Sequence, residues 1–105
     1  MTARERLPNR RASETLELTI AGLGYTCTVS RYADGRIAEI FLTNHKSNSA
    51  ADVGARDAAI AFSFAVQHGA ESDAIRLALC RDSHGRPSGP LGAALDLLAQ
   101  GERRP

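Results

Sequence analysis

Aromatic residues are scarce in this 105-residue chain, and neither sign of charge dominates it. Phe, Tyr and Trp make up 5% of the sequence, Trp is absent, and the formal net charge is +1 at pH 7. Proteins that bind nucleic acid usually concentrate positive charge and stacking aromatic side chains on one surface. The overall composition therefore gives little support to a chain devoted to nucleic acid.

Long apolar runs and a cysteine framework are missing as well. No run approaches the ~20 apolar residues of a membrane helix, and no apolar segment follows residues 1–6 as it would in a secretory signal. We therefore expect a cytoplasmic protein without membrane contact. Cys27 and Cys80 are too few for a disulfide framework, and we expect both to be reduced and buried, with a redox pair as the alternative.

The remaining composition is that of one globular domain, with 43% hydrophobic and 24% charged residues. Residues 1–13 carry four arginines against one glutamate and contain Pro8, which predicts a basic extended arm. Residues 14–100 form the predicted domain, which is mildly acidic, and residues 101–105 form a tail. The arm either contacts phosphate or an acidic protein surface or is a solvated terminus.

Period-two alternation of apolar and polar residues predicts strands at 14–20, 25–32 and 37–43. Asp34-Gly35 is a strong hairpin signal between the second and third of these strands. Short turns between the strands favour an antiparallel meander. The third strand is apolar on both faces apart from Glu39, so we expect Phe41 in the core.

The period then changes to that of helices. Ser49 or Asp52 can cap a helix that runs to about His68, before Gly69. Its apolar positions cover nearly the whole circumference, so we expect it to be buried on most sides. Further helices are predicted at 71–81 and from Pro90 to about residue 100. The predicted fold is α+β, with order β-β-β-α-α-α and the helices packed on one face of the sheet.

Several short motifs resemble a known family when they are taken in order. They are Leu7-Pro8-Asn9-Arg10-Arg11, Asp34-Gly35-Arg36-Ile37-Ala38-Glu39-Ile40-Phe41, His45-Lys46 and Gln67-His68-Gly69. Their order and spacing resemble the TSCPD family, the C-terminal domain of adenosylcobalamin-dependent ribonucleotide reductases, over roughly residues 7–98. The resemblance implies a stand-alone accessory or regulatory module, not catalytic by itself. The alanine-rich helix that ends near His68 offers a surface for pairing with its own copy or for docking on a reductase. The motif that names the family, a cysteine next to proline, is absent here, so no metal or redox role is carried over.

One cluster of polar residues is a candidate ligand site. His45 and Lys46 follow the third strand, and together with Arg36 and the arm residues Arg10 and Arg11 they can hold a phosphate. This cluster supports an alternative function, a small nucleotide or nucleic-acid binding protein, in which exposed tyrosines would stack on bases. The structural alternative is equally physical: Glu39 on a buried strand needs a partner, which His45, Lys46 or an arm arginine can supply.

Other chemistry finds no support in the sequence. The three histidines and two cysteines match no zinc spacing, so we expect no metal and no cofactor. No serine or cysteine lies in the context of a catalytic nucleophile, and we expect no catalytic residues. The glycine-rich segment 83–90 is either a connecting loop or an anion site at a helix start.

Overall fold

The computed structural model describes residues 3–7 and 13–102, and it confirms the predicted α+β fold. Three antiparallel strands pair in the order β1-β2-β3: β1 (Ser13–Ile20), β2 (Leu23–Arg31) and β3 (Ile37–Asn44). Three helices follow: α1 (Ala50–Gln67), α2 (Ser72–Ala78) and α3 (Pro90–Glu102). In the part of the chain that the structure describes, no helix is long and apolar enough to span a membrane.

Two tight turns fix the register of the meander. Ala21 (φ 51°) and Gly22 (φ 78°) join β1 to β2 in the left-handed conformation that two-residue hairpins need. In the second turn, the Asp34 carboxylate accepts the Arg36 N–H at 3.0 Å and Gly35 has φ 94°. These turns place Leu18 opposite Tyr25, and β2 then pairs with β3 with one irregularity at Ser30/Arg31.

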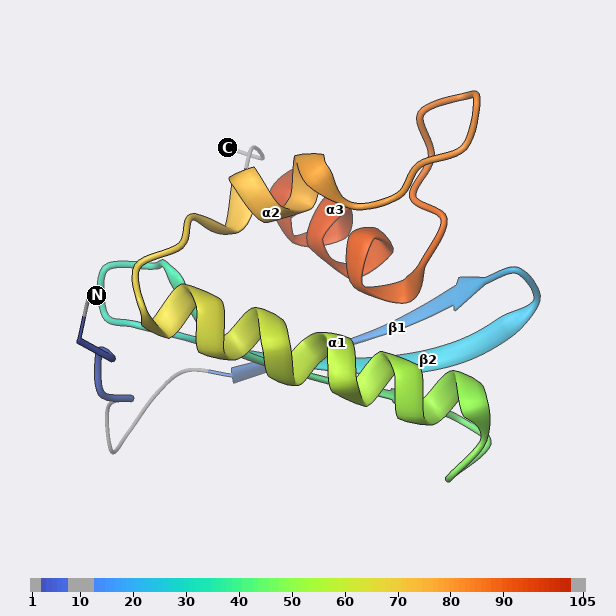
Figure 1. Cartoon of the computed structure of the whole chain (residues 1–105), viewed down its shortest axis with the longest axis horizontal. Helices are drawn as coiled ribbons and strands as arrows, with labels where there is room; N and C mark the ends of the chain where they lie inside the picture. Colours follow the sequence, from blue (N-terminus) through green and yellow to red (C-terminus); the bar gives the residue numbers. More distant parts are fainter. Residues whose placement is uncertain (1–2, 8–12, 103–105) are drawn as a thin grey trace.

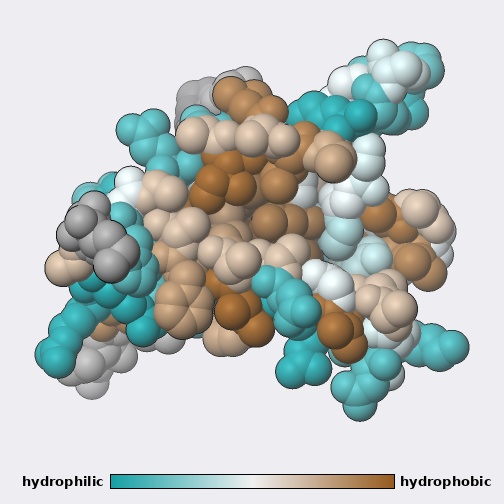
Figure 2. Space-filling model, viewed as in Figure 1, coloured by the Kyte–Doolittle hydropathy of each residue, from teal (hydrophilic) through white to brown (hydrophobic). Residues whose placement is uncertain are grey.

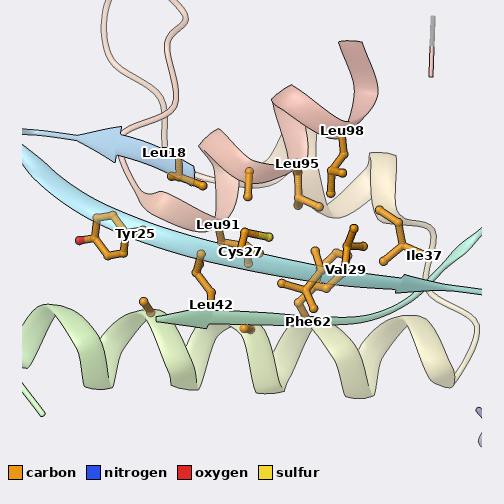
Figure 3. Packing of buried hydrophobic residues seen from close by; sticks show 14 of the residues in the cluster. Leu18, Tyr25, Cys27, Val29, Ile37, Leu42, Phe62, Leu91, Leu95 and Leu98 are labelled. Atoms are coloured by element: carbon orange, nitrogen blue, oxygen red, sulfur yellow. The ribbon is translucent and has the colours of Figure 1, made fainter. Parts of the chain in front are cut away.

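The core lies between one face of the sheet and the helices. Cys27, Val29, Ile40 and Leu42 are the largest fully buried side chains. Phe62 from α1 and Leu95 from α3 pack into the same cluster (Figure 3). Helix α1 runs along β3 while α3 lies over β1, so both helices cover the same face of the sheet (Figure 1).

The prediction that Phe41 is a core residue was wrong. Its side chain is 59% exposed, whereas its neighbours Ile40 and Leu42 are 1% exposed. Alternation along β3 sends the two neighbours toward the helices and Phe41 to the opposite face, where it lies across from Thr28. We call this second face the open face, because none of the three helices covers it.

The first helix is less buried than its composition predicted. Ser49 is the N-cap residue as expected, and its hydroxyl accepts the Asp52 N–H. Val53, Ile60 and Phe64, however, are 47%, 53% and 51% exposed, because α1 contacts the rest of the domain along one side only. The second helix is also shorter than predicted, since Leu79 is already extended (φ −71°, ψ 157°). The prediction that Cys80 is buried was wrong, because this residue follows the end of the helix and is exposed, whereas Cys27 on β2 is buried.

Candidate functional site

His45 directly follows β3 and lies on the open face. Its Nε2 atom is 3.0 Å from Glu17 Oε2 and 3.2 Å from Thr26 Oγ1. A Cβ atom on Gly24 would lie 2.6 Å from His45 Nδ1, so the absence of a side chain at this position makes room for the imidazole. His45 therefore bonds Glu17 rather than Glu39, which lies further along the open face opposite Ser30.

Lys46 lies in a loop that is held firmly to the start of α1. Its N–H donates to Asn44 Oδ1 at 2.8 Å, and its carbonyl accepts the Ser49 hydroxyl at 2.7 Å. The N–H groups of Asn48 and Asn44 donate to Asp52 and hold the pKa of that carboxyl below its usual range. The side chain of Lys46 itself is exposed to solvent.

Arg36 lies at the other end of β3. Its guanidinium pairs with Asp34 at 2.7 Å and Glu5 at 3.0 Å, and it stacks over the Tyr32 ring at 4.8 Å. Strand β3 separates Arg36 from His45 by roughly 30 Å at about 3.3 Å per residue, so one phosphate cannot contact both. Arg10 and Arg11 lie outside the described residues.

The described part of the arm, residues 3–7, packs against the end of α1. The Glu5 N–H donates to the Gln67 carbonyl at 2.6 Å, and Arg4 donates to the Gln67 side chain. The Arg4 guanidinium also lies 5.1 Å from the centre of the Phe64 ring. Arg4 and Glu5 thus have structural partners within the domain.

Three polar side chains of α1 bond the outer edge of β3. Ser63 Oγ accepts the Ile40 N–H at 2.9 Å and donates to the Ile40 carbonyl at 3.2 Å. Gln67 Nε2 donates to the Ala38 carbonyl, and Asp52 Oδ1 accepts the Asn44 N–H. All three residues are buried. Their spacing of eleven and four residues puts them on one side of the helix, a periodicity that the sequence already contains.

An apolar cleft opens between α1 and the segment that leads into α3. Its volume is about 370 Å³, within the range of ligand pockets, and no charged residue lines it. Its lining includes Tyr25, Gly54, Ala58, Leu79, Cys80 and Leu91. Figure 2 shows hydrophobic residues gathering between α1 and the α2–α3 pair.

Tyr25 is the notable polar residue of this cleft. Its side chain is 3% exposed, yet its hydroxyl has no hydrogen-bond partner within residues 3–7 and 13–102. Figure 3 shows the hydroxyl at the end of the ring that points away from the other labelled core residues. The hydroxyl is not among the fully buried polar atoms without a partner, so it can donate to a ligand in the cleft and offers an apolar ligand one specific polar contact. The sequence alone does not reveal this site, because its lining comes from four separate segments.

The remaining candidates form hydrogen bonds within their own segments. The segment after Arg81 is a small hairpin, in which Asp82 accepts N–H bonds from His84 (2.8 Å) and Arg86 (3.0 Å). These bonds hold the pKa of Asp82 below its usual range. His68 bonds the Phe64 carbonyl in its own helix. Among the residues that the structure describes, no group of three histidine, cysteine or acidic side chains can hold a metal ion.

Comparison with curated proteins finds partial similarity to B12-dependent ribonucleotide reductases. The chain is 39% identical over 66 residues to the Vitamin B12-dependent ribonucleotide reductase of Agrobacterium fabrum. The matched segment covers 63% of this chain and 5% of that enzyme. It is 34% identical over 73 residues to the enzyme of the same name from Bradyrhizobium diazoefficiens, covering 70% of this chain and 6% of that enzyme. The chain thus spans about one-twentieth of the length of these relatives. No family model and no solved structure matches it.

Proposed function

We propose that this chain is a non-catalytic accessory module for a B12-dependent ribonucleotide reductase, a detached TSCPD-like counterpart of a small region of that enzyme. The similarity to about one-twentieth of the reductase supports the partner. The chain contributes a binding surface, and the reductase contributes the chemistry. The single observation that carries the proposal is the uncharged cleft that Tyr25 lines, with a hydroxyl free to bond a docked group.

The lining of the cleft defines the group that would dock there. Alanines and Gly54 on α1 let a partner approach the helix closely, and Leu79 and Leu91 offer apolar contacts on the other side. The Tyr25 hydroxyl can pair with one polar atom at the inner end of the docked group. We propose an apolar side chain of the reductase next to an exposed backbone carbonyl as the occupant.

The test is titration of the purified chain into a B12-dependent reductase such as the Agrobacterium fabrum enzyme, with binding and deoxynucleotide formation measured together. We expect the isolated chain to form no deoxynucleotide, and the complex to differ from the reductase alone in rate. Gly54→Leu should abolish this effect, because a Cβ at Gly54 meets open space and the larger side chain then fills the cleft.

Gln100→Leu is the matched control, since it adds the same side chain at an exposed position on α3 outside the cleft. It should bind the reductase as the unmodified chain does. Deoxynucleotide formation by the isolated chain, or no binding to the reductase at all, would reject the accessory module. Equal binding by the Gly54→Leu variant would move the docking site away from the cleft.

The second candidate function is a nucleotide or nucleic-acid binder, favoured by the exposed Phe41 ring on the same face as His45. An exposed aromatic ring on a sheet can stack on a base while Lys46 contacts phosphate. Glu17 and Glu39 on that face oppose phosphate binding. If this chain binds nucleic acid, its affinity for single-stranded oligonucleotides should fall steeply with salt concentration. Phe41→Ala should lower that affinity at least about tenfold, because it removes one base-stacking contact. Binding indifferent to salt, or equal in that variant, would contradict it.

A further inference from the structure

The two edges of the sheet differ in whether the rest of the described chain bonds their outward backbone groups. The β3 edge is bonded by Ser63, Gln67 and Asp52 of α1. The β1 edge spans eight residues without proline, and no residue in the described ranges bonds its outward backbone groups. An open edge of this length is a template for another strand.

The register identifies which β1 groups point outward. Because Ile40 uses its N–H and carbonyl to bond Ser63, it cannot exchange them with Val29 across the β2–β3 ladder. Antiparallel bonding alternates, so Val29 bonds Glu14 on the other side. The backbone groups of Thr15, Glu17 and Thr19 then point away from the sheet.

We propose that two copies of this chain associate through β1, antiparallel and about a two-fold axis, so that two three-stranded sheets become one of six strands. The occupant of the open edge is a second copy because β1 is self-complementary. With Leu16 of each copy on the axis, Thr15 faces Glu17 of the second copy, and both use their outward N–H and carbonyl groups. Shifting the axis to Glu17 would instead place two carboxylates opposite each other, which is unfavourable.

Side chains at this edge support the same arrangement. Leu16 is half-buried and lies beside Leu97 and Leu98 of α3 in a hollow of about 290 Å³. Leu97 is 42% exposed, although α3 lies over β1. Across the two-fold axis, the Leu16 and Leu97 side chains of both copies meet and extend each core.

The acidic side chains of β1 do not protect the edge. Glu14 pairs with Arg31 at 3.4 Å, and Glu17 lies 3.0 Å from His45, so both carboxylates have partners within one copy. Charged side chains normally guard an exposed edge by bringing a desolvation cost to any incoming strand. Here the local partners reduce that cost, and the edge stays available for pairing.

Light scattering on the full chain over roughly a hundredfold concentration range tests the association. We expect the mass to rise toward that of a dimer, and Leu97→Glu to weaken the association at least about tenfold by placing like charges near the axis. Leu77→Glu is the matched control, because Leu77 is 66% exposed on α2 and should leave the mass unchanged. A monomer at every concentration, or equal loss of association in both variants, would overturn the proposal.

Cross-linking tests the register in a Cys80→Ser background, which removes the exposed thiol. Leu16→Cys should form an intermolecular disulfide, because directly opposed residues of this kind have Cα atoms about 4.5 Å apart. Glu17→Cys should react at least about tenfold more slowly, because the two positions lie diagonally at about 7–8 Å. Faster reaction of Glu17→Cys, or no cross-link in either variant, would overturn the proposed pairing.

Discussion

Phe62→Ala is expected to lower the free energy of unfolding by about 3–5 kcal/mol, the usual cost of removing a buried ring. Phe62 is 3% exposed and lies between α1 and the buried face of the sheet (Figure 3). Such a loss is a large part of the roughly 5–15 kcal/mol that stabilises a domain of this size. Urea denaturation should show a lower midpoint with an unchanged slope.

Phe41→Ala is the matched control for this prediction, because it removes the same ring from the open face. Phe41 is 59% exposed, so its loss should cost less than about 1 kcal/mol. Equal costs for the two variants would contradict the placement of both rings. A costly Phe41→Ala alone would show that something covers the open face in solution.

The two phenylalanines also show where the sequence was sufficient and where it was not. The turns at Gly22 and Asp34-Gly35 and the alternation of β2 were enough to predict the meander, because turn chemistry and pleat are local properties. An apolar residue on both faces of β3 gives no such local signal. Phe41 could be assigned to a face only after Ile40 was seen to bond α1.

The candidate site was harder to predict for a related reason. His45 and Arg36 are nine residues apart in the sequence and both are cationic or polar, yet the extended strand between them places them at opposite ends of the sheet. The cleft at Tyr25, by contrast, gathers Gly54, Leu79 and Leu91 from distant segments. Packing of the helices, which composition does not encode residue by residue, creates that cleft.

Ser63→Ala should produce the second large effect, a loss of about 2–3 kcal/mol, because it leaves two buried backbone groups of Ile40 without a partner. The change removes one oxygen atom and leaves almost no cavity, so the loss reports hydrogen bonding rather than packing. Hydrogen exchange at the Ile40 amide should accelerate together with the fall in unfolding free energy. Ser47→Ala, at an exposed position of the loop before α1, should change neither quantity.

A loss below about 0.5 kcal/mol in Ser63→Ala, the level of an ordinary surface change, would show that the β3 edge does not depend on α1. The asymmetry of the two edges would then disappear, because β3 would be as available to a second strand as β1. Ser63→Ala can also show the expected loss while the dimer persists at concentrations where the variant is still folded. That result would show that the β3 edge depends on α1 and that the β1 edge forms the dimer. Helix α1 would then close one side of the sheet, and β1 would be the side through which the chain meets its copy.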